Sequence, residues 1–276
     1  MKNWFITGAN RGLGLEVARA ALENGDRVIA TARRPESIHT TLSGYKNSLI
    51  ALPLDVTSVD SVNTAMQQAV SFMPRIDVLV NNAGFGQLGA FEELSSELVH
   101  RQFETNVFGV FNVTRAVLPI MRAQKSGHIV NISSTCGITG FEGASLYCAT
   151  KFAISGWSES LSIELALFGI KATCVYPGPF RTDFLDNSSV VFGDITINDY
   201  QSISQARREL LSQANHQQNG DPVRFGQALV KLVESDNPPV RWGAGSNAYD
   251  TLMARANDLR HDAIKWHELS KSTDIN

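Results

Sequence analysis

Three polar side chains near the middle of the chain have the types and spacing for proton transfer to a substrate oxygen. Tyr147 and Lys151 are four residues apart at the start of a helical pattern, so their side chains share one helix face. Ser134 lies thirteen residues before Tyr147. One unit charge at about 4 Å supplies roughly 4 kcal/mol at an effective dielectric of about 20, enough to lower a tyrosine pKa from about 10 to about 7. Tyr147 could then exchange a proton with a substrate oxygen that the Ser134 hydroxyl holds by a hydrogen bond.

A Tyr–Lys pair at this spacing also occurs by chance on many helices, so its interpretation depends on the rest of the chain. Two elements would position these residues: a buried strand, predicted by the apolar run 128–132, and a helix over 145–168. Ser134 would then follow the carboxyl end of a strand, and Tyr147 would lie in the first turn of a helix.

The N-terminal residues predict a strand, a glycine turn and a helix, which together are typical of dinucleotide binding. Residues 2–7 are an apolar run, and apolar residues at helical spacing follow from 15 to about 24. Gly8 would allow the tight turn, Gly12 would let a pyrophosphate approach the helix N-terminus, and Gly14 would permit close helix–strand packing. The glycine spacing differs from that of the common fingerprint, but strand and helix flank it correctly. The cofactor-binding candidates here are Thr7, Gly8, Asn10, Arg11, Gly12, Leu13 and Gly14.

The end of the second predicted strand, 27–32, indicates which dinucleotide is bound. An NAD-preferring protein places an acidic residue there, whereas this chain has Arg33 and Arg34. A guanidinium offers a planar fork of donors that suits a 2′-phosphate. We therefore infer NADP(H), with Arg33 as the first candidate, Arg11 as the second and Arg34 as the third. The alternative is that Arg33 and Arg34 are a solvated strand end.

Seven strand patterns alternate with helical patterns along the chain, at 2–7, 27–32, 49–54, 76–80, 128–132, 171–176 and 239–242. Such alternation predicts an α/β fold: a doubly wound parallel sheet of the Rossmann type, about seven strands with helices on both faces, forming a single domain over 1–276. Ligands bind at the carboxyl ends of such strands. Candidates at these ends are Asp55 and Val56, then Asn82, Ala83 and Gly84. Asp55 either caps the helix 59–72 or accepts from the adenine amino group.

Taken together, these segments resemble the single-domain short-chain dehydrogenase/reductase family, and the resemblance covers roughly residues 1–185. The motifs occur in the family's order. They are Thr7-Gly8 with Gly12-Leu13-Gly14, Asp55-Val56, Asn81-Asn82-Ala83-Gly84, Asn106, Asn131-Ile132-Ser133-Ser134, Tyr147 with Lys151, and Pro177-Gly178.

The resemblance implies a role for each matching residue. Tyr147 would exchange the proton, Ser134 would orient the oxygen, and Lys151 would bind the nicotinamide ribose and lower the pKa of Tyr147. Asn106, in a long helix expected over 96–124, would anchor a water relay to Lys151, although it could instead satisfy a helix irregularity. Pro177, Gly178 and Thr182 would hold the nicotinamide carboxamide, with helix capping as the alternative for Thr182.

Two C-terminal segments lie where this fold varies. Residues 183–220 have little regular pattern except around 205–211, and we expect them to form a substrate lid. Phe85, Phe141, Phe180 and Phe184 are candidate substrate contacts of a mainly apolar pocket, or else core residues. Residues 246–276 form a helical tail that resembles the subgroup of 17β-hydroxysteroid dehydrogenases and bacterial relatives; it would cap the substrate site or cover a subunit face.

The composition of the chain excludes some classes of binding partner. The 276 residues are 43% hydrophobic with a formal net charge of −3, so nucleic acid and anionic membrane are poor candidates. The three cysteines lack metal-ligand spacing and the histidines are scattered, so we expect reduced thiols and no metal. No signal-peptide or membrane-spanning pattern occurs, which predicts a cytoplasmic protein. The helices over 96–124 and 145–168 resemble the family's dimerisation pair, so we expect a homodimer or homotetramer.

The sequence thus predicts an NADP(H)-dependent oxidoreductase that interconverts a small hydrophobic carbonyl compound, ketone or aldehyde, and the corresponding alcohol. Reduction is the expected direction, since cells usually keep the NADPH pool reduced. One alternative is a hydroxysteroid-type alcohol dehydrogenase that works in the oxidative direction. Another, from a different class, is a non-catalytic NADP-sensing regulatory protein. A sugar-nucleotide epimerase, which shares the Tyr–Lys pair, fits the glycine spacing poorly.

Overall fold

The computed structural model of the chain describes residues 1–186 and 189–275, and within them a seven-stranded, all-parallel sheet forms the centre. The strand order is β3-β2-β1-β4-β6-β7-β9. The order reverses between β1 and β4, where the chain crosses back over the sheet, and this is where open α/β sheets bind ligands. The predicted fold is confirmed. The bounds are β1 (Asn3–Thr7), β2 (Arg27–Ala32), β3 (Leu49–Pro53), β4 (Val78–Asn81), β6 (Gly127–Ile132), β7 (Ile170–Pro177) and β9 (Arg241–Ala244).

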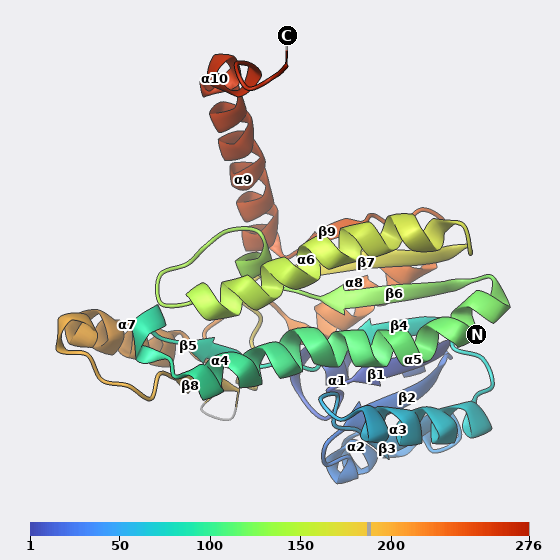
Figure 1. Cartoon of the computed structure of the whole chain (residues 1–276). Helices are drawn as coiled ribbons and strands as arrows, with labels where there is room; N and C mark the ends of the chain where they lie inside the picture. Colours follow the sequence, from blue (N-terminus) through green and yellow to red (C-terminus); the bar gives the residue numbers. More distant parts are fainter. Residues whose placement is uncertain (187–188, 276) are drawn as a thin grey trace.

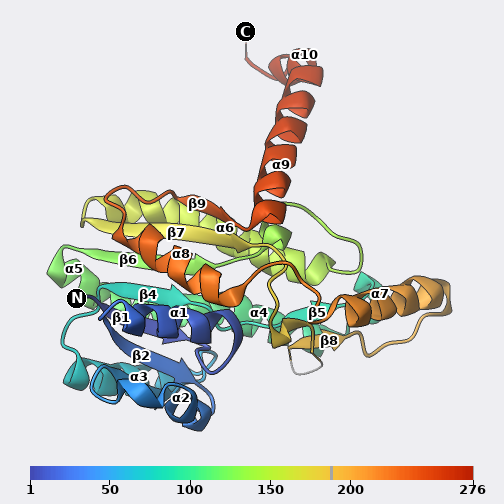
Figure 2. The ribbon, with the colours of Figure 1, turned by 180° about the vertical axis from the view of Figure 1, so that it is seen from behind.

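Helices cover both faces of the sheet (Figures 1 and 2). Alternate residues of β1 point to opposite faces, so Trp4 and Ile6 belong to one hydrophobic core and Phe5 to the other. The first core is closed by α1 (Gly12–Glu23), α8 (Pro222–Glu234) and part of α2 (Glu36–Thr41); the second is closed by α3 (Val59–Phe72), α5 (Gly109–Gln124) and α6 (Ser145–Ala166). The two cores hold the strand ends in a fixed arrangement.

The long helix expected over 96–124 is interrupted. It consists of α4 (Ser96–Phe103), a π-helical turn (Glu104–Phe108) and α5. A Cβ atom added at Gly109, directly after the turn, would lie 2.6 Å from a methyl carbon of Val56, so α5 packs there at backbone distance. Such single π turns are frequent at functional sites. Asn106 lies within this one.

The expected lid is more regular than its sequence indicates. A short strand β8 (Val190–Phe192) pairs in parallel with β5 (Gly86–Leu88), and α7 (Gln201–Ala214) extends well beyond the expected 205–211. The two ends of the lid meet, because the Arg181 N–H donates to the Gly220 carbonyl at 2.8 Å. Residues 187–188 of the expected lid lie outside the described residues.

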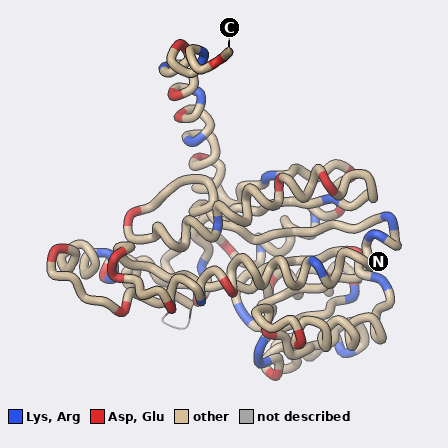
Figure 3. The backbone as a smooth tube through the Cα atoms, in the orientation of Figure 1, with Lys and Arg blue, Asp and Glu red and all other residues tan. Residues whose placement is uncertain are grey.

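The C-terminal tail forms α9 (Ser246–Lys265) and α10 (His267–Lys271), which project away from the sheet (Figure 1). Only the root of α9 packs on the protein, with Leu252 against β9, and residues 256–275 are all exposed. Basic and acidic residues are interspersed along the tail (Figure 3). No described residue of the tail lines the pocket discussed below, so within one chain the tail does not cap it.

Candidate active site

A pocket of about 700 Å³ opens at the carboxyl ends of the strands and gathers most of the predicted site residues. Its walls are the glycine turn after β1, the ends of β2, β3, β4, β6 and β7, the first turns of α6, and the lid. The predicted residues that line it are Gly8, Asn10, Arg11, Gly12, Leu13, Arg33, Asp55, Val56, Asn82, Ala83, Gly84, Phe85, Ser134, Tyr147, Lys151, Pro177, Gly178, Phe180, Thr182 and Phe184.

Five predicted residues lie outside the pocket lining: Thr7, Gly14, Arg34, Asn106 and Phe141. Thr7 is buried, and its hydroxyl accepts from the Asn82 and Ala83 N–H groups at 3.0 Å each. Arg34 is exposed beyond β2. Phe141 is 40% exposed, on the loop before α6, so its prediction as a substrate contact is not supported.

The glycine turn requires glycine. Gly8 has a φ of +64°, and a Cβ atom there would lie 2.9 Å from the Ala83 Cα. A Cβ atom on Gly14 would lie 2.5 Å from the Gly8 carbonyl oxygen, which confirms the predicted close packing. The Asn82 side chain donates to the carbonyl groups of Thr7 and Gly8 at 3.0 and 2.9 Å and so joins β4 to the turn.

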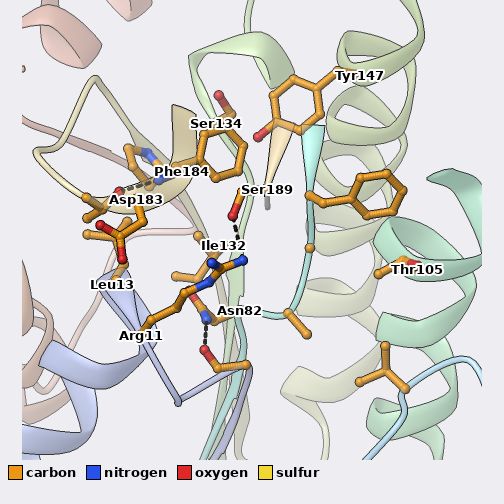
Figure 4. Close-up of a pocket in the computed structure, with 18 of the residues that line it drawn as sticks. Arg11, Leu13, Asn82, Thr105, Ile132, Ser134, Tyr147, Asp183, Phe184 and Ser189 are labelled. Carbon is orange, nitrogen blue, oxygen red and sulfur yellow. Dashed lines mark hydrogen bonds between the residues drawn. The ribbon is translucent and has the colours of Figure 1, made fainter. Parts of the chain in front are cut away.

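Ser134, Tyr147 and Lys151 meet at one end of the pocket. The Ser134 and Tyr147 side chains are seen close together in Figure 4. The Lys151 ammonium lies 5.6 Å from the centre of the Tyr147 ring and donates to the Ile132 carbonyl oxygen at 2.9 Å. Each of Tyr147 and Lys151 is 7% exposed. The strand β6 and the helix α6 therefore bring the three side chains to one point, as the sequence predicts.

Burial sets the protonation of this group. It raises the pKa of Tyr147, an effect that the neighbouring Cys136 reinforces and the Ser134 hydroxyl opposes. Burial also lowers the pKa of Lys151 to about 8. Lys151 has no resolved effect on the pKa of Tyr147 here, so the expectation that it lowers this pKa stays a prediction. The direction of the Tyr147 shift favours the phenol over the phenolate.

Asn106 joins two walls of the site. Its side-chain amide donates to the Phe85 carbonyl at 2.9 Å and to the Thr150 hydroxyl at 3.3 Å, and its oxygen accepts from the Phe85 N–H at 3.1 Å. These bonds connect the segment after β4 to α6, one residue before Lys151. Asn106 lies in the π turn, but its bonds reach Phe85 and Thr150 outside that turn, so both of its expected roles stay predictions.

At the other end of the pocket, Arg11 and Arg33 come from two different turns. Arg33 is exposed and lines the pocket, and Arg11 donates to the Ser189 hydroxyl at 2.8 Å, which joins the glycine turn to the lid (Figure 4). Asp55 accepts from the Thr57 N–H at 3.0 Å and the Thr57 hydroxyl at 2.7 Å. It does not cap α3, contrary to one of its two predicted roles, because the Ser58 hydroxyl does so.

Thr182 caps a short turn, which is the alternative role that the sequence left open. Its hydroxyl accepts from the Phe184 N–H at 3.3 Å and so caps a short 3-10 turn, while its side chain still lines the pocket. Phe184 follows it, with its ring 6.0 Å from the Tyr147 ring. Sequence reasoning missed further lining residues, among them Arg101, Glu104, Leu185, Ser189 and Val191. They belong to no motif, and their place in the pocket depends on tertiary packing such as the β5–β8 pairing.

A family profile, a curated relative and two solved structures all resemble this chain. The family profile described as short chain dehydrogenase matches residues 2–190. A 3-ketodihydrosphingosine reductase of Bacteroides thetaiotaomicron is 39% identical over 266 residues, covering 96% of this chain and 95% of that protein. A crystal structure of a short-chain dehydrogenase from Streptomyces avermitilis is 37% identical, with a TM-score of 0.91 over 99% of this chain and 100% of that one. The structure of ElxO with NADP bound is 29% identical, with a TM-score of 0.72 over 88% of this chain and 96% of that one.

The chain therefore belongs to the short-chain dehydrogenase family and is an oxidoreductase. Among the described residues, no helix has the length and apolar character needed to span a membrane.

Proposed function

We propose that this protein is an NADPH-dependent carbonyl reductase that converts a hydrophobic ketone or aldehyde to the alcohol. The observation that carries the proposal is a single pocket whose two ends hold, respectively, the Ser134–Tyr147–Lys151 group and the glycine turn with Arg11 and Arg33. The first group has the chemistry to protonate an oxygen, and the second has the chemistry to hold a phosphorylated dinucleotide.

In this proposal the residues act as follows. The Ser134 hydroxyl holds the carbonyl oxygen, and the Tyr147 phenol donates its proton to that oxygen as negative charge develops there. Bound NADPH supplies the hydride. Lys151 holds the nicotinamide ribose and stabilises the phenolate left on Tyr147 by its charge. Asn106 anchors a water relay that returns a proton towards Lys151.

Reduction is the proposed working direction because cells usually keep the NADPH pool reduced. The alternative of a hydroxysteroid-type dehydrogenase acting oxidatively needs the phenolate as a base. Its test is turnover of hydroxysteroids with NADP⁺.

The proposed preference for NADPH over NADH rests on the positive charge of two arginines. Arg33 lines the pocket directly after β2, Arg11 lines it from the glycine turn, and the residues that follow β2 include no carboxylate before Glu36. The relative ElxO binds NADP in its structure. Arg33→Asp should weaken NADPH binding by at least tenfold and leave NADH binding within a few fold; equal weakening of both would remove Arg33 from this role.

The substrate side of the pocket is mainly apolar. Phe85, Phe184, Leu185 and Val191 line it around Tyr147, which suits a hydrophobic carbonyl compound. The relative from Bacteroides thetaiotaomicron is named for the reduction of 3-ketodihydrosphingosine, so that ketone belongs in any substrate panel.

The test is the oxidation of NADPH and of NADH by the purified chain, followed at the nicotinamide absorbance, across a panel of ketones and aldehydes. Turnover with NADPH supports the proposal, and the ranking of carbonyls defines the pocket. Tight NADPH binding with no turnover on any carbonyl or alcohol would instead support the NADP-sensing alternative.

We also propose that two copies pair through α5 and α6, as expected from the family. Near this face Phe108, Phe152, Ile163 and Leu167 are between 41% and 77% exposed. Apolar exposure on adjacent helices favours association. Sedimentation equilibrium of wild type and of Ile163→Glu should give a dimer or tetramer and a smaller species, respectively; an unchanged mass would place the contact elsewhere.

A further inference from the structure

One buried polar side chain in the pocket wall has no part in the arrangement described so far. Gln218, in the loop between α7 and α8, lines the pocket and is only 8% exposed. Its side-chain oxygen is fully buried, and no described residue donates to it. Across the part of the chain that the structure describes, the side-chain nitrogen forms no hydrogen bond either. Buried polar groups in proteins are nearly always paired, so the unpaired amide of Gln218 indicates a missing partner.

The backbone around Gln218 is fixed to the segment that follows β7. The Gln218 carbonyl accepts from the Arg181 side chain at 3.2 Å, and the Gly220 N–H donates to the Pro179 carbonyl at 3.0 Å. A Cβ atom on Gly220 would lie 2.6 Å from a ring carbon of Phe180, so the two segments are closely packed. The loop therefore holds the amide at one place in the wall.

This place adjoins the expected nicotinamide site. Residues 177–182 are the segment that we expect to hold the nicotinamide carboxamide, and Phe180 within it pairs with Gly220 as a parallel β-bridge. On the other side of the loop, Asp221 caps α8 by accepting from the Val223 N–H at 2.8 Å. Gln218 is thus joined to the expected carboxamide segment and is anchored by a helix start.

The chemistry of a primary amide distinguishes between the polar groups of a dinucleotide. A pyrophosphate offers only acceptors, so it would leave the Gln218 oxygen unpaired. A carboxamide offers an NH₂ group and a carbonyl oxygen, which pair with the oxygen and the NH₂ group of a glutamine side chain. The terminal torsion of glutamine is broad, so the amide can turn either atom towards the pocket.

We propose that Gln218 is a cofactor-binding residue that pairs, amide to amide, with the nicotinamide carboxamide and so fixes the orientation of the ring. The inference rests on the proposed function, in which this pocket binds NADP(H). In the free chain the buried oxygen carries the cost of its lost hydration without a partner, and the bound cofactor supplies the missing donor.

The first test is the stability of Gln218→Met without cofactor. Methionine is unbranched like glutamine and lacks the amide, so it removes the unpaired oxygen and nearly keeps the volume. The variant should unfold in urea at the same midpoint as wild type or at a higher one, because the cost of burying an unpaired oxygen is gone. Gln217→Met, at the neighbouring exposed position, is the matched control. A lower midpoint for Gln218→Met alone would show that the amide has a structural role.

The second test is calorimetric titration with three ligands in the absence of a carbonyl substrate. The Kd for NADP⁺ should rise about tenfold in Gln218→Met and stay within about twofold in Gln217→Met. In the 3-acetylpyridine analogue of NADP⁺ a methyl group replaces the carboxamide NH₂ group, so the same substitution should weaken its binding by less than about threefold. Adenosine 2′,5′-bisphosphate lacks the nicotinamide and should bind all three proteins alike.

Two binding results would overturn the proposal. Unchanged NADP⁺ affinity in Gln218→Met would remove Gln218 from the cofactor site, and equal weakening of NADP⁺ and its acetylpyridine analogue would place the contact on a group other than the carboxamide NH₂. If the wild type binds NADP⁺ but turns over no carbonyl, the proposed reduction fails, while the affinities still decide the role of Gln218.

Discussion

The glycine turn after β1 and the lid face each other across one pocket, but they are held by different kinds of contact. In the turn, backbone approaches backbone: Gly8 requires a positive φ, and Asn82 donates to two carbonyl groups of the turn. In the lid, α7 has no buried residue, and the connections to the rest include the short β5–β8 pairing, a few backbone bonds and side-chain bonds such as Arg11 to Ser189.

This difference indicates which wall of the pocket tolerates substitution and which does not. The cofactor wall tolerates almost no change in backbone geometry, because the packing of two cores and the close approach of β1 to β4 fix it. The lid is held by contacts that single substitutions can remove, and elements of this kind are drawn from the low-stability end of a fold. We therefore expect large, all-or-none effects at the first wall and graded effects at the second.

The strongest test of the fixed wall is Tyr147→Phe. Removal of the phenolic hydroxyl removes the proton donor but keeps the ring against Phe184, so NADPH binding should stay within a few fold while turnover falls by about 10³-fold. Single-turnover NADPH oxidation measures the loss. A variant that kept most of its rate would show that the proton comes from another group.

The glycine turn is tested next, with Gly8→Ala. A Cβ atom there meets the Ala83 backbone at 2.9 Å in a conformation that disfavours alanine, so we expect about 1–3 kcal/mol of lost stability and much weaker NADPH binding. Urea unfolding and cofactor titration measure the two effects. Gly140→Ala, where an added Cβ atom meets nothing within 4 Å, is the matched control. Equal losses of stability and of NADPH binding in the two variants would contradict the view that the glycine turn tolerates no change of its backbone.

The pH dependence of the reduction rate is a further test of the fixed wall of the pocket. Lys151 is protonated below its pKa of about 8 and neutral above, so reduction should be roughly constant below pH 7 and decline as the pH rises through about 8. Lys151→Arg cannot lose its charge in this range, so whatever activity it retains should lack that decline. A wild-type profile flat to pH 10 would exclude Lys151 as the titrating group.

The smallest expected effect lies in the lid. Ser189→Ala removes the acceptor of the Arg11 hydrogen bond, and its loss should cost about 1 kcal/mol of closed-lid stability. KM for NADPH should rise about fivefold with kcat changed less than twofold. Ser202→Ala, on exposed α7, is the control. A change in the unfolding midpoint as large as that of Gly8→Ala would mean that the lid is as integral to the fold as the turn.

The same division explains what the sequence could predict. The glycine turn and the strand ends follow from local spacing, because strand and helix periodicity place them at one edge of a parallel sheet. The Ser134–Tyr147–Lys151 group follows from its spacing together with the family resemblance. The β5–β8 pairing joins Gly86–Leu88 to Val190–Phe192. No local sequence pattern predicts a contact between segments so far apart along the chain. The π turn depends on how α5 meets Val56, and the raised pKa of Tyr147 depends on burial. Both are properties of the packed molecule.

The projecting tail has a thermodynamic consequence. Residues 256–275 are exposed throughout, so their unfolding in a single chain uncovers less apolar surface per residue than unfolding of the sheet and adds little to the heat capacity change or to the denaturant m-value. A helix without tertiary contacts is held only by its intrinsic propensity, which is marginal at this length. In an isolated chain the tail would therefore melt gradually, as a sloping helical signal before the cooperative transition of the sheet, and any partner that covers it would be visible as the disappearance of that slope.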